Sequence, residues 1–362
     1  MSINNELERE ISSYEKKLTF KQRLKYISVV GFSLLTLSSS LFFEKNNHSP
    51  NVSLENKIQI EETEPIEETE VSINTQLVNN NVDSTEDNLL PQKEIISAKP
   101  YTLVSSKRLD VGLHLYEIIP HQRSTIGDSK ITILKINPDN YEFGFYTTQE
   151  HDRIPIRLRT LSYSRCRTAE EWANEFDLVT VINAGMYEGD DSSTGYMVNF
   201  NEIITPNFKP GYNSVLAFNR NDSNVPRVKI IDLKTDNLND LEGRYNSFLQ
   251  SMRMIGNNHN YWSPSHRKWS IAALSTDKVG NLYLIHSRSP FSVHEFNEVI
   301  MNLPINIDRM MYLEGGPEAS LYINSNGNIF RKIGSYETGF WENNNNRRFW
   351  PLPNVIGLRK RH

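Results

Sequence analysis

The sequence predicts an α+β fold: a single strand-rich domain with few helices over residues 101–362, preceded by an N-terminal transmembrane helix and a disordered linker. Three observations lead to this prediction. Short runs rich in β-branched and aromatic residues recur from about Tyr101 onward. Only two stretches in that part carry the signals that start a helix. The first hundred residues are polar apart from a single apolar run.

The apolar run, residues 26–43, reads YISVVGFSLLTLSSSLFF and contains no charged residue. At helical rise it covers about 27 Å, enough to cross the hydrocarbon core of a bilayer. Lysines and an arginine gather before it, within the tail 1–25, and favour a cytoplasmic N-terminus. We expect a single-pass anchor, with the domain that follows outside the cytoplasm, in the periplasm or at the cell surface. A cleaved signal peptide is the alternative, with Ser38–Ser40 as its small-residue cleavage site.

Residues 44–100 have the composition of a linker. They are rich in Asn, Glu, Ser and Thr, and they contain the direct repeat IEETEPIEETE. Such a segment buries too little apolar surface to offset the entropy lost on ordering. A self-repelling, extended acidic spacer is therefore expected, and a tract that binds cations or a partner is the alternative.

The domain itself is predicted from alternating apolar runs. The expected strands are 113–119, 131–136, 141–147, 178–183, 214–219, 269–275, 281–287, 309–314, 319–324 and 354–359. The two expected helices, 168–176 and 292–303, each begin with Thr or Ser three residues before Glu, the spacing of a capping box. Segments 277–281 and 324–328 supply Gly and Asn where a hairpin needs positive φ.

Composition excludes several classes of protein. The net charge of −5 and the absence of a dense basic run in the second half argue against nucleic acid as a partner. The single cysteine, Cys166, rules out an internal disulfide and a zinc site built on cysteine pairs. No nucleotide, flavin or metal motif is present, so no cofactor and no metal site are expected.

The segment 181–199, VINAGMYEGDDSSTGYMVN, is the first candidate site. A predicted strand ends at Asn183, Gly185 lets the backbone turn close to a ligand, and acidic residues including Asp190 follow. The alternative interpretation is an ordinary turn with a solvated acidic tip. The acidic residues match no complete calcium loop.

Two further candidates lie later in the chain. Arg253 has apolar neighbours on both sides and needs an anionic partner, either Glu314 or a substrate phosphate. His286 ends the predicted strand 281–287, where a structural role is the alternative. In YLEGGPEAS, Glu314 ends an apolar strand, and the side-chain-free Gly315 and Gly316 permit close approach of a ligand.

Taken in order, five segments resemble the phosphodiester glycosidase family. INAGMY is similar to its Asn-Gly-Gly-Phe-Phe motif, and TGYMVN falls where the family has a glycine-led strand. NLYLIHS resembles its segment ending in histidine, NVIGLR its closing strand, and YLEGGPEAS its Leu-Asp-Gly-Gly-Gly-Ser signature. The chain departs from the signature at Glu314, Pro317 and Glu318. The resemblance covers most of 101–362 and implies the family's fold.

The resemblance also implies a hydrolase that cleaves a sugar-1-phosphodiester bond in envelope or exopolysaccharide metabolism. The sugar-phosphate or polysaccharide substrate would meet a predicted site of catalytic and substrate-binding residues. The predicted catalytic residues are Glu314, His286 and Asn183; the predicted substrate-binding residues are Gly185, Arg253, Gly315, Gly316, Glu318 and Asp190. Two alternatives stay open: a non-catalytic glycan-binding envelope protein, and a hydrolase of simple glycosides, peptidoglycan or teichoic-type polymers.

Overall fold

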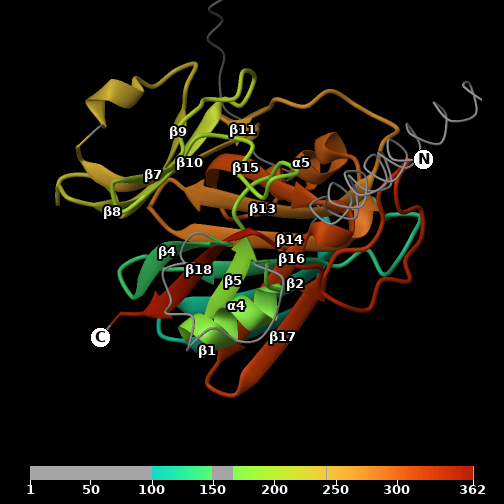
Figure 1. The fold of residues 1–362 in the computed structure, drawn as a ribbon. Coiled ribbons are helices and arrows are strands. Elements are labelled where there is room, and N and C mark those ends of the chain that lie inside the picture. The colour runs from blue at the N-terminus through green and yellow to red at the C-terminus, as the bar shows by residue number, and fades with distance from the viewer. Residues whose placement is uncertain (1–99, 149–165, 242, 362) are drawn as a thin grey trace, which may run out of the picture. The chain divides into compact units, whose positions relative to one another are not determined.

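The computed structural model describes residues 100–148, 166–241 and 243–361 (Figure 1). The predicted tail, membrane span and nearly all of the linker lie outside these residues. Among the described helices, none has the length and apolarity needed to cross a bilayer. The described residues form three β-sheets, and all the paired strands in these ranges run antiparallel.

The largest sheet has eight strands. In spatial order they are β1 (Tyr101–Asp110), β2 (Leu113–Pro120), β3 (Ile131–Ile136), β14 (Leu282–Phe291), β13 (Trp269–Asp277), β15 (Ile307–Gly315), β11 (Arg253–Gly256) and β12 (His259–Asn260).

The other two sheets have five strands each. The second sheet orders β7 (Glu202–Thr205), β6 (Met197–Asn199), β10 (Tyr245–Ser251), β8 (Ser214–Arg220) and β9 (Val228–Asp232). The third orders β17 (Asn328–Ile333), β16 (Ser320–Ser325), β5 (Thr180–Asn183), β18 (Asn354–Lys360) and β4 (Tyr141–Thr147).

Two α-helices cover the outer faces of two of these sheets. Helix α4 (Ala169–Phe176) packs Trp172 against the third sheet, and α5 (Val293–Met301) packs Phe296 against the eight-stranded sheet. Both helices begin with the predicted capping box, in which the Thr168 or Ser292 side chain and a Glu side chain satisfy each other's backbone N–H groups. Short 3₁₀ turns, η2 (Leu238–Asp240) and η3 (Gly316–Glu318), complete the elements.

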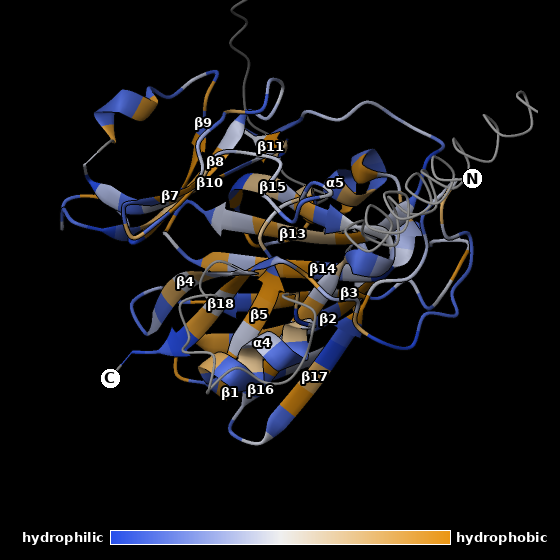
Figure 2. Ribbon diagram, viewed as in Figure 1, coloured by the Kyte–Doolittle hydropathy of each residue, from blue (hydrophilic) through white to orange (hydrophobic). Residues whose placement is uncertain are grey.

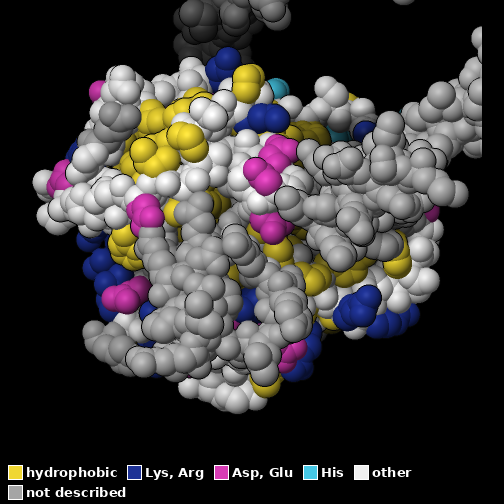
Figure 3. All heavy atoms as spheres, in the orientation of Figure 1, with side chains coloured by type: hydrophobic (Ala, Val, Ile, Leu, Met, Phe, Trp, Pro, Cys, Tyr) yellow, Lys and Arg dark blue, Asp and Glu magenta, His cyan; other side chains and the backbone are white. Residues whose placement is uncertain are grey.

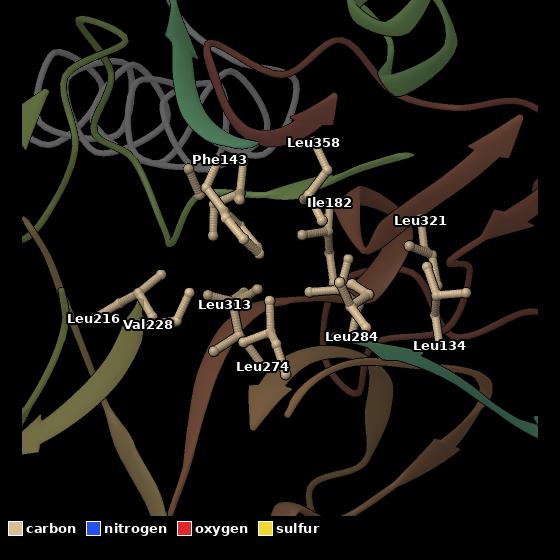
Figure 4. Packing of buried hydrophobic residues seen from close by; sticks show 14 of the residues in the cluster. Leu134, Phe143, Ile182, Leu216, Val228, Leu274, Leu284, Leu313, Leu321 and Leu358 are labelled. Atoms are coloured by element: carbon tan, nitrogen blue, oxygen red, sulfur yellow. The ribbon is translucent and has the colours of Figure 1, made fainter. Parts of the chain in front are cut away.

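The main core lies between the eight-stranded and the third sheet. Figure 4 shows Ile182 and Leu358 of the third sheet facing Leu284 and Leu313 of the large one, and Leu216 of the second sheet joins them. Strands between two apolar layers are buried on both faces and therefore read as continuous apolar runs. The first part of β14, Leu-Tyr-Leu-Ile, is such a run, and Figure 2 shows orange in β14 and β5.

At the edge strand β4, a side chain instead of a further strand forms hydrogen bonds with the backbone of Phe145. Asn199, at the end of β6, donates its Nδ2 to the Phe145 carbonyl at 3.1 Å and accepts the Phe145 N–H on Oδ1 at 3.4 Å. The amide thus reproduces the donor and acceptor that a neighbouring residue in a β-ladder would supply.

The strand-rich α+β prediction is confirmed for the described residues. Both predicted helices and both predicted hairpins are present, with Gly280 and Gly327 at positive φ in the two turns. The sequence interpretation missed the mostly exposed strand β1 and the partly exposed strand β17, and it did not assign β7, β9, β10, β11 or β12. An exposed strand has no buried face, so its sequence lacks the apolar alternation that marks a half-buried strand.

Candidate functional site

Asn183 connects the end of β5 to the segment that follows the predicted glycine turn. Its Nδ2 donates to the carbonyl of Glu318 at 3.0 Å, and its Oδ1 accepts the N–H of Ser320 at 2.8 Å. The side chain is 1% exposed. Because β5 pairs with β16 from Leu321 onward, this amide extends the ladder past the end of the strand. Asn183 therefore fixes the backbone position of Glu318.

The turn itself, from Gly315 to Glu318, is tightly surrounded by protein. A Cβ on Gly315 would lie 2.1 Å from the Tyr312 hydroxyl and 2.5 Å from Trp269 Cδ1. Gly316 has a φ of +66°, and a Cβ there would lie 2.4 Å from a Glu337 carboxylate oxygen. The two glycines are required by conformation and by space. In the structure, the close approach predicted for a ligand is made by the chain's own side chains.

Two carboxylates flank this turn, and both are almost fully buried. Glu314 is 3% exposed and Glu318 4%. Glu314 Oε1 accepts the N–H of Gly315 at 3.0 Å, while Glu318 Oε1 accepts the hydroxyl of Tyr187 at 3.0 Å. The strand end and the turn thus place two acidic groups four residues apart in sequence at one end of the core.

Three phenols surround the two carboxylates. Burial, and then the charges of Glu318 and Glu314, raise the pKa of Tyr187 well above its ordinary value. Burial and the charge of Glu314 act in the same way on Tyr312, and they raise the pKa of Tyr212 to about 12. The phenols stay protonated at neutral pH and can act as hydrogen-bond donors. We refer to these five residues as the carboxylate cluster.

His286 lies beneath the exit of the turn. It is 1% exposed, and its Nε2 is 3.2 Å from the carbonyl of Ala319. Because a carbonyl oxygen can only accept, this contact places the ring proton on Nε2. Burial lowers the pKa of His286 to about 3, so the ring is neutral over the physiological range. The geometry suits a residue that holds the backbone in place better than one that exchanges protons with solvent.

Arg253 has a different ionic partner from the one suggested by sequence. The sequence interpretation offered Glu314, but Arg253 Nη1 contacts both oxygens of Asp232, at 2.6 and 2.8 Å. Its guanidinium carbon lies 3.3 Å from the centroid of the Tyr261 ring. Asp232 ends β9, a strand that the sequence interpretation had not assigned. Arg253 Nε is buried and has no hydrogen-bond partner among the described residues.

Gly185 and Asp190 belong to the loop after β5. Gly185 has a φ of +78°, and a Cβ there would meet Leu249 at an ordinary 3.6 Å. Asp190 is exposed and accepts the N–H and the hydroxyl of Ser192, which lower the pKa of its carboxyl. The hydrogen bonds of Asp190 therefore close a turn within the loop.

The sequence interpretation thus named both carboxylates and their amide tether, but it missed the phenols. Tyr187 stands inside the INAGMY segment, and Tyr312 lies two residues before Glu314, so both were near recognised positions. Tyr212 follows a Pro-Gly turn and carries no recognisable signal. Within the described ranges, no group of three or more His, Cys, Asp or Glu is arranged to hold a metal ion.

Two surface cavities, of about 360 and 680 Å³, do not coincide with this cluster. Neither is lined by Asn183, Glu314 or Glu318. We place the candidate site at the cluster because its buried carboxylates carry the chemistry, whereas a cavity alone shows only space.

The family model of the phosphodiester glycosidases matches residues 176–359. This range contains all five residues of the carboxylate cluster, together with Asn183 and His286. No curated protein matches the sequence.

Several solved structures are similar to the chain, among them the following two. The catalytic domain of zebrafish N-acetylglucosamine-1-phosphodiester alpha-N-acetylglucosaminidase, auto-inhibited by its pro-peptide, is 14% identical with a TM-score of 0.46, over 72% of this chain and 82% of that one. A hypothetical protein from Synechocystis is 12% identical with a TM-score of 0.47, over 73% of this chain and 64% of that one.

Proposed function

The chain belongs to the phosphodiester glycosidase family, and we therefore propose that it is a hydrolase that cleaves the bond between a sugar's anomeric carbon and a phosphodiester. One observation carries this proposal beyond family membership. Two buried carboxylates, Glu314 and Glu318, flank one turn, and the Asn183 amide fixes the backbone between them. Hydrolysis at an anomeric carbon is commonly performed by a pair of carboxyl groups.

At the anomeric carbon the proposed reaction makes one bond and breaks one, and a proton moves from water to Glu314. The oxygen of a water molecule bonds to the anomeric carbon, and the bond from that carbon to the phosphate oxygen breaks with its electron pair leaving on phosphate. The water proton passes to Glu314, which we assign as the base. The departing phosphate monoester is already a stable anion, so the reaction needs less help from a general acid than cleavage of an ordinary glycoside does.

Glu318 and Tyr187 would act next to this base. The Tyr187 hydroxyl donates to Glu318 Oε1 at 3.0 Å and stays protonated, so the pair forms a fixed donor and acceptor beside Glu314. Groups held in this way need no reorganisation when charge develops in the transition state. We assign Glu318 as the second carboxylate and Tyr187 as the residue that orients it.

Asn183 and His286 are proposed as positioning residues. Asn183 holds the backbone of Glu318 and Ser320, and His286 holds the carbonyl of the intervening Ala319. A displacement of about 1 Å at a reacting group can reduce a rate by about 100-fold, so such supports matter to catalysis without touching substrate. Substrate contacts by Arg253, Gly185, Asp190 and the two turn glycines are part of the same proposal.

We also propose that the domain works outside the cytoplasm, held by the anchor 26–43, on glycans of the envelope or exopolysaccharide. The support is the sequence: an uncharged run long enough to span a bilayer, with a positive flank before it and a polar spacer after it.

The test is release of phosphate monoester from a sugar-1-phosphodiester by the full chain. Wild type should turn over, and Glu314→Gln should lose about 10²–10⁴-fold in kcat/KM because the base is removed at nearly constant shape. Glu117→Gln is the matched control: Glu117 is a partly buried carboxylate on β2, paired with Lys332.

Equal activity of Glu314→Gln and wild type would remove Glu314 from the catalytic role. Absence of turnover in wild type, with retained binding of the same substrate, would instead support the non-catalytic glycan-binding alternative.

A further inference from the structure

Four arginines line one cavity whose wall contains none of the carboxylate cluster residues. The cavity, of about 360 Å³, lies between β4, β8 and β18, and Arg220, Arg227, Arg359 and Arg361 contribute to its wall. Its volume is in the range of small-molecule sites. We refer to it as the arginine pocket. Figure 3 shows dark-blue side chains gathered at the left edge, beside the place of the C-terminal strand in Figure 1.

The hydrogen bonds of two of these arginines leave their charge uncompensated. Arg220 donates Nη1 to the carbonyls of Ser223 and Val225, and Arg359 donates Nε and Nη2 to the carbonyl of Phe176. A neutral carbonyl satisfies a donor but does not neutralise a guanidinium. Both side chains are therefore oriented by the backbone while keeping a full positive charge.

The other two arginines each have an acidic partner. Arg227 donates Nε to Asp139, and Arg361 reaches Glu142 at a long 3.4 Å, with side-chain exposures of 32% and 37%. Glu142 is the one carboxylate among the residues that line the pocket. Four positive charges thus face one negative charge within the wall, and a second, Asp139, stands beside it.

We propose that the arginine pocket binds a phosphate group. Several guanidinium groups in the wall of one cavity suit a multiply charged tetrahedral anion, whereas one planar carboxylate is satisfied by a single guanidinium fork. The Tyr146 ring also lines the pocket, and its centroid is 5.7 Å from the Arg359 guanidinium carbon.

The arginine pocket also lies close enough to the candidate site for one extended ligand to reach both. Asn183 and Tyr146 both pair with Val355 of β18, and Arg359 is four residues further along that strand. Four residues of strand span about 13 Å. A polymer with phosphate in its repeating unit could occupy both places, and this last step rests on the proposed function. Phosphate binding at the pocket does not.

The experiment is calorimetric titration of the full chain with inorganic phosphate and pyrophosphate, and with glucuronate as the carboxylate comparator. Wild type should bind phosphate and pyrophosphate more tightly than glucuronate. Arg220→Gln with Arg359→Gln should weaken pyrophosphate binding at least about tenfold for each guanidinium lost. Arg227→Gln with Arg361→Gln, which alters exposed side chains, should weaken it without affecting folding, as its melting temperature will show.

Two controls separate the pocket from other sites. Arg331→Gln removes an exposed arginine of β17, which is paired with Glu170 of α4. This variant should leave the affinity for pyrophosphate unchanged. Glu314→Gln should lose hydrolysis but keep pyrophosphate binding at the pocket, so failure of the proposed function is distinguishable from failure of this site.

Three results would overturn the proposal: absence of any heat of binding in wild type, unchanged affinity in both double variants, or tighter binding of glucuronate than of phosphate.

Discussion

The carboxylate cluster and the arginine pocket are opposites in charge, burial and origin. The cluster holds two acids that are 3% and 4% exposed, on either side of one turn; Glu318 accepts a hydrogen bond from Tyr187 of another segment, and Glu314 accepts one from the adjacent Gly315 N–H. The pocket is open, positive and assembled from residues far apart in the chain. The cluster therefore depends on exact packing, and the pocket on summed charge. Substitutions that disturb side-chain packing should therefore affect the carboxylate cluster and not the arginine pocket.

The largest expected effect comes from Gly316→Ala. The new Cβ meets the Glu337 carboxylate at 2.4 Å and holds a φ of +66° that disfavours a side chain. Left-handed strain costs about 1–2 kcal/mol and overpacking about 1–3, so we expect about 3 kcal/mol lower stability in urea unfolding. Gly327→Ala is the control, because Gly327 has a φ of +77° in open space and should cost only the strain. Equal costs would show that the packing around Gly316 is loose.

Asn183→Ala should have the next largest effect. It leaves the N–H of Ser320 buried without its partner, at about 1–3 kcal/mol, and releases Glu318, so kcat/KM should fall about 100-fold. Asn199→Ala removes the same kind of paired hydrogen bonds between a side-chain amide and the backbone, here at Phe145. It should lower stability by a similar amount with little loss of activity. Pyrophosphate binding should be unchanged in Asn183→Ala. Loss of that binding would show that the carboxylate cluster and the arginine pocket are not independent.

His286 predicts a dependence of stability on pH. Its folded-state pKa of about 3 lies below the ordinary 6.5, so the unfolded chain takes up the proton first as pH falls. The contribution to stability is complete above pH 6.5 and is lost progressively between 6.5 and 3. Between pH 7.5 and 5.5 the unfolding free energy should fall by about 1.4 kcal/mol more in wild type than in His286→Gln. Parallel curves would indicate that the ring is accessible to protons.

Tyr187→Phe should have the smallest effect. It removes the donor to Glu318 Oε1 while keeping the ring, so kcat/KM should fall about tenfold, with a smaller loss of stability. Glu318→Gln in the same background tests coupling, since the two losses should be less than additive if the pair acts as a unit. Fully additive losses would show that Tyr187 and Glu318 act independently.

Prediction from sequence succeeded where one segment carries the whole signal. The capping boxes, the hairpin glycines and the strand end at Glu314 are all local patterns, and the structure contains them. Residues 183 and 314–318 were proposed as site residues because each lies at or just after the end of a buried strand. Their roles in substrate binding stay predictions.

Prediction failed where a contact depends on which strands are neighbours. Arg253 pairs with Asp232 instead of Glu314 because β9 ends beside β11, and spacing along the chain does not give that adjacency. Tyr212 and the arginine pocket were missed for the same reason. Tyr187 of the INAGMY segment and Glu318, a departure from the family signature, are far apart in the sequence, yet these two side chains are hydrogen-bonded to each other.

The two hydrogen bonds between the Asn199 amide and the Phe145 backbone also bear on solubility. A β4 edge with free N–H and carbonyl groups would be a template for a strand from another molecule, the route by which sheets aggregate. One amide covers that edge at Phe145, and the arginine pocket adds like charge further along, where Phe143 also lines its wall. The same residues that would attract an anion would thus repel a second copy of the chain.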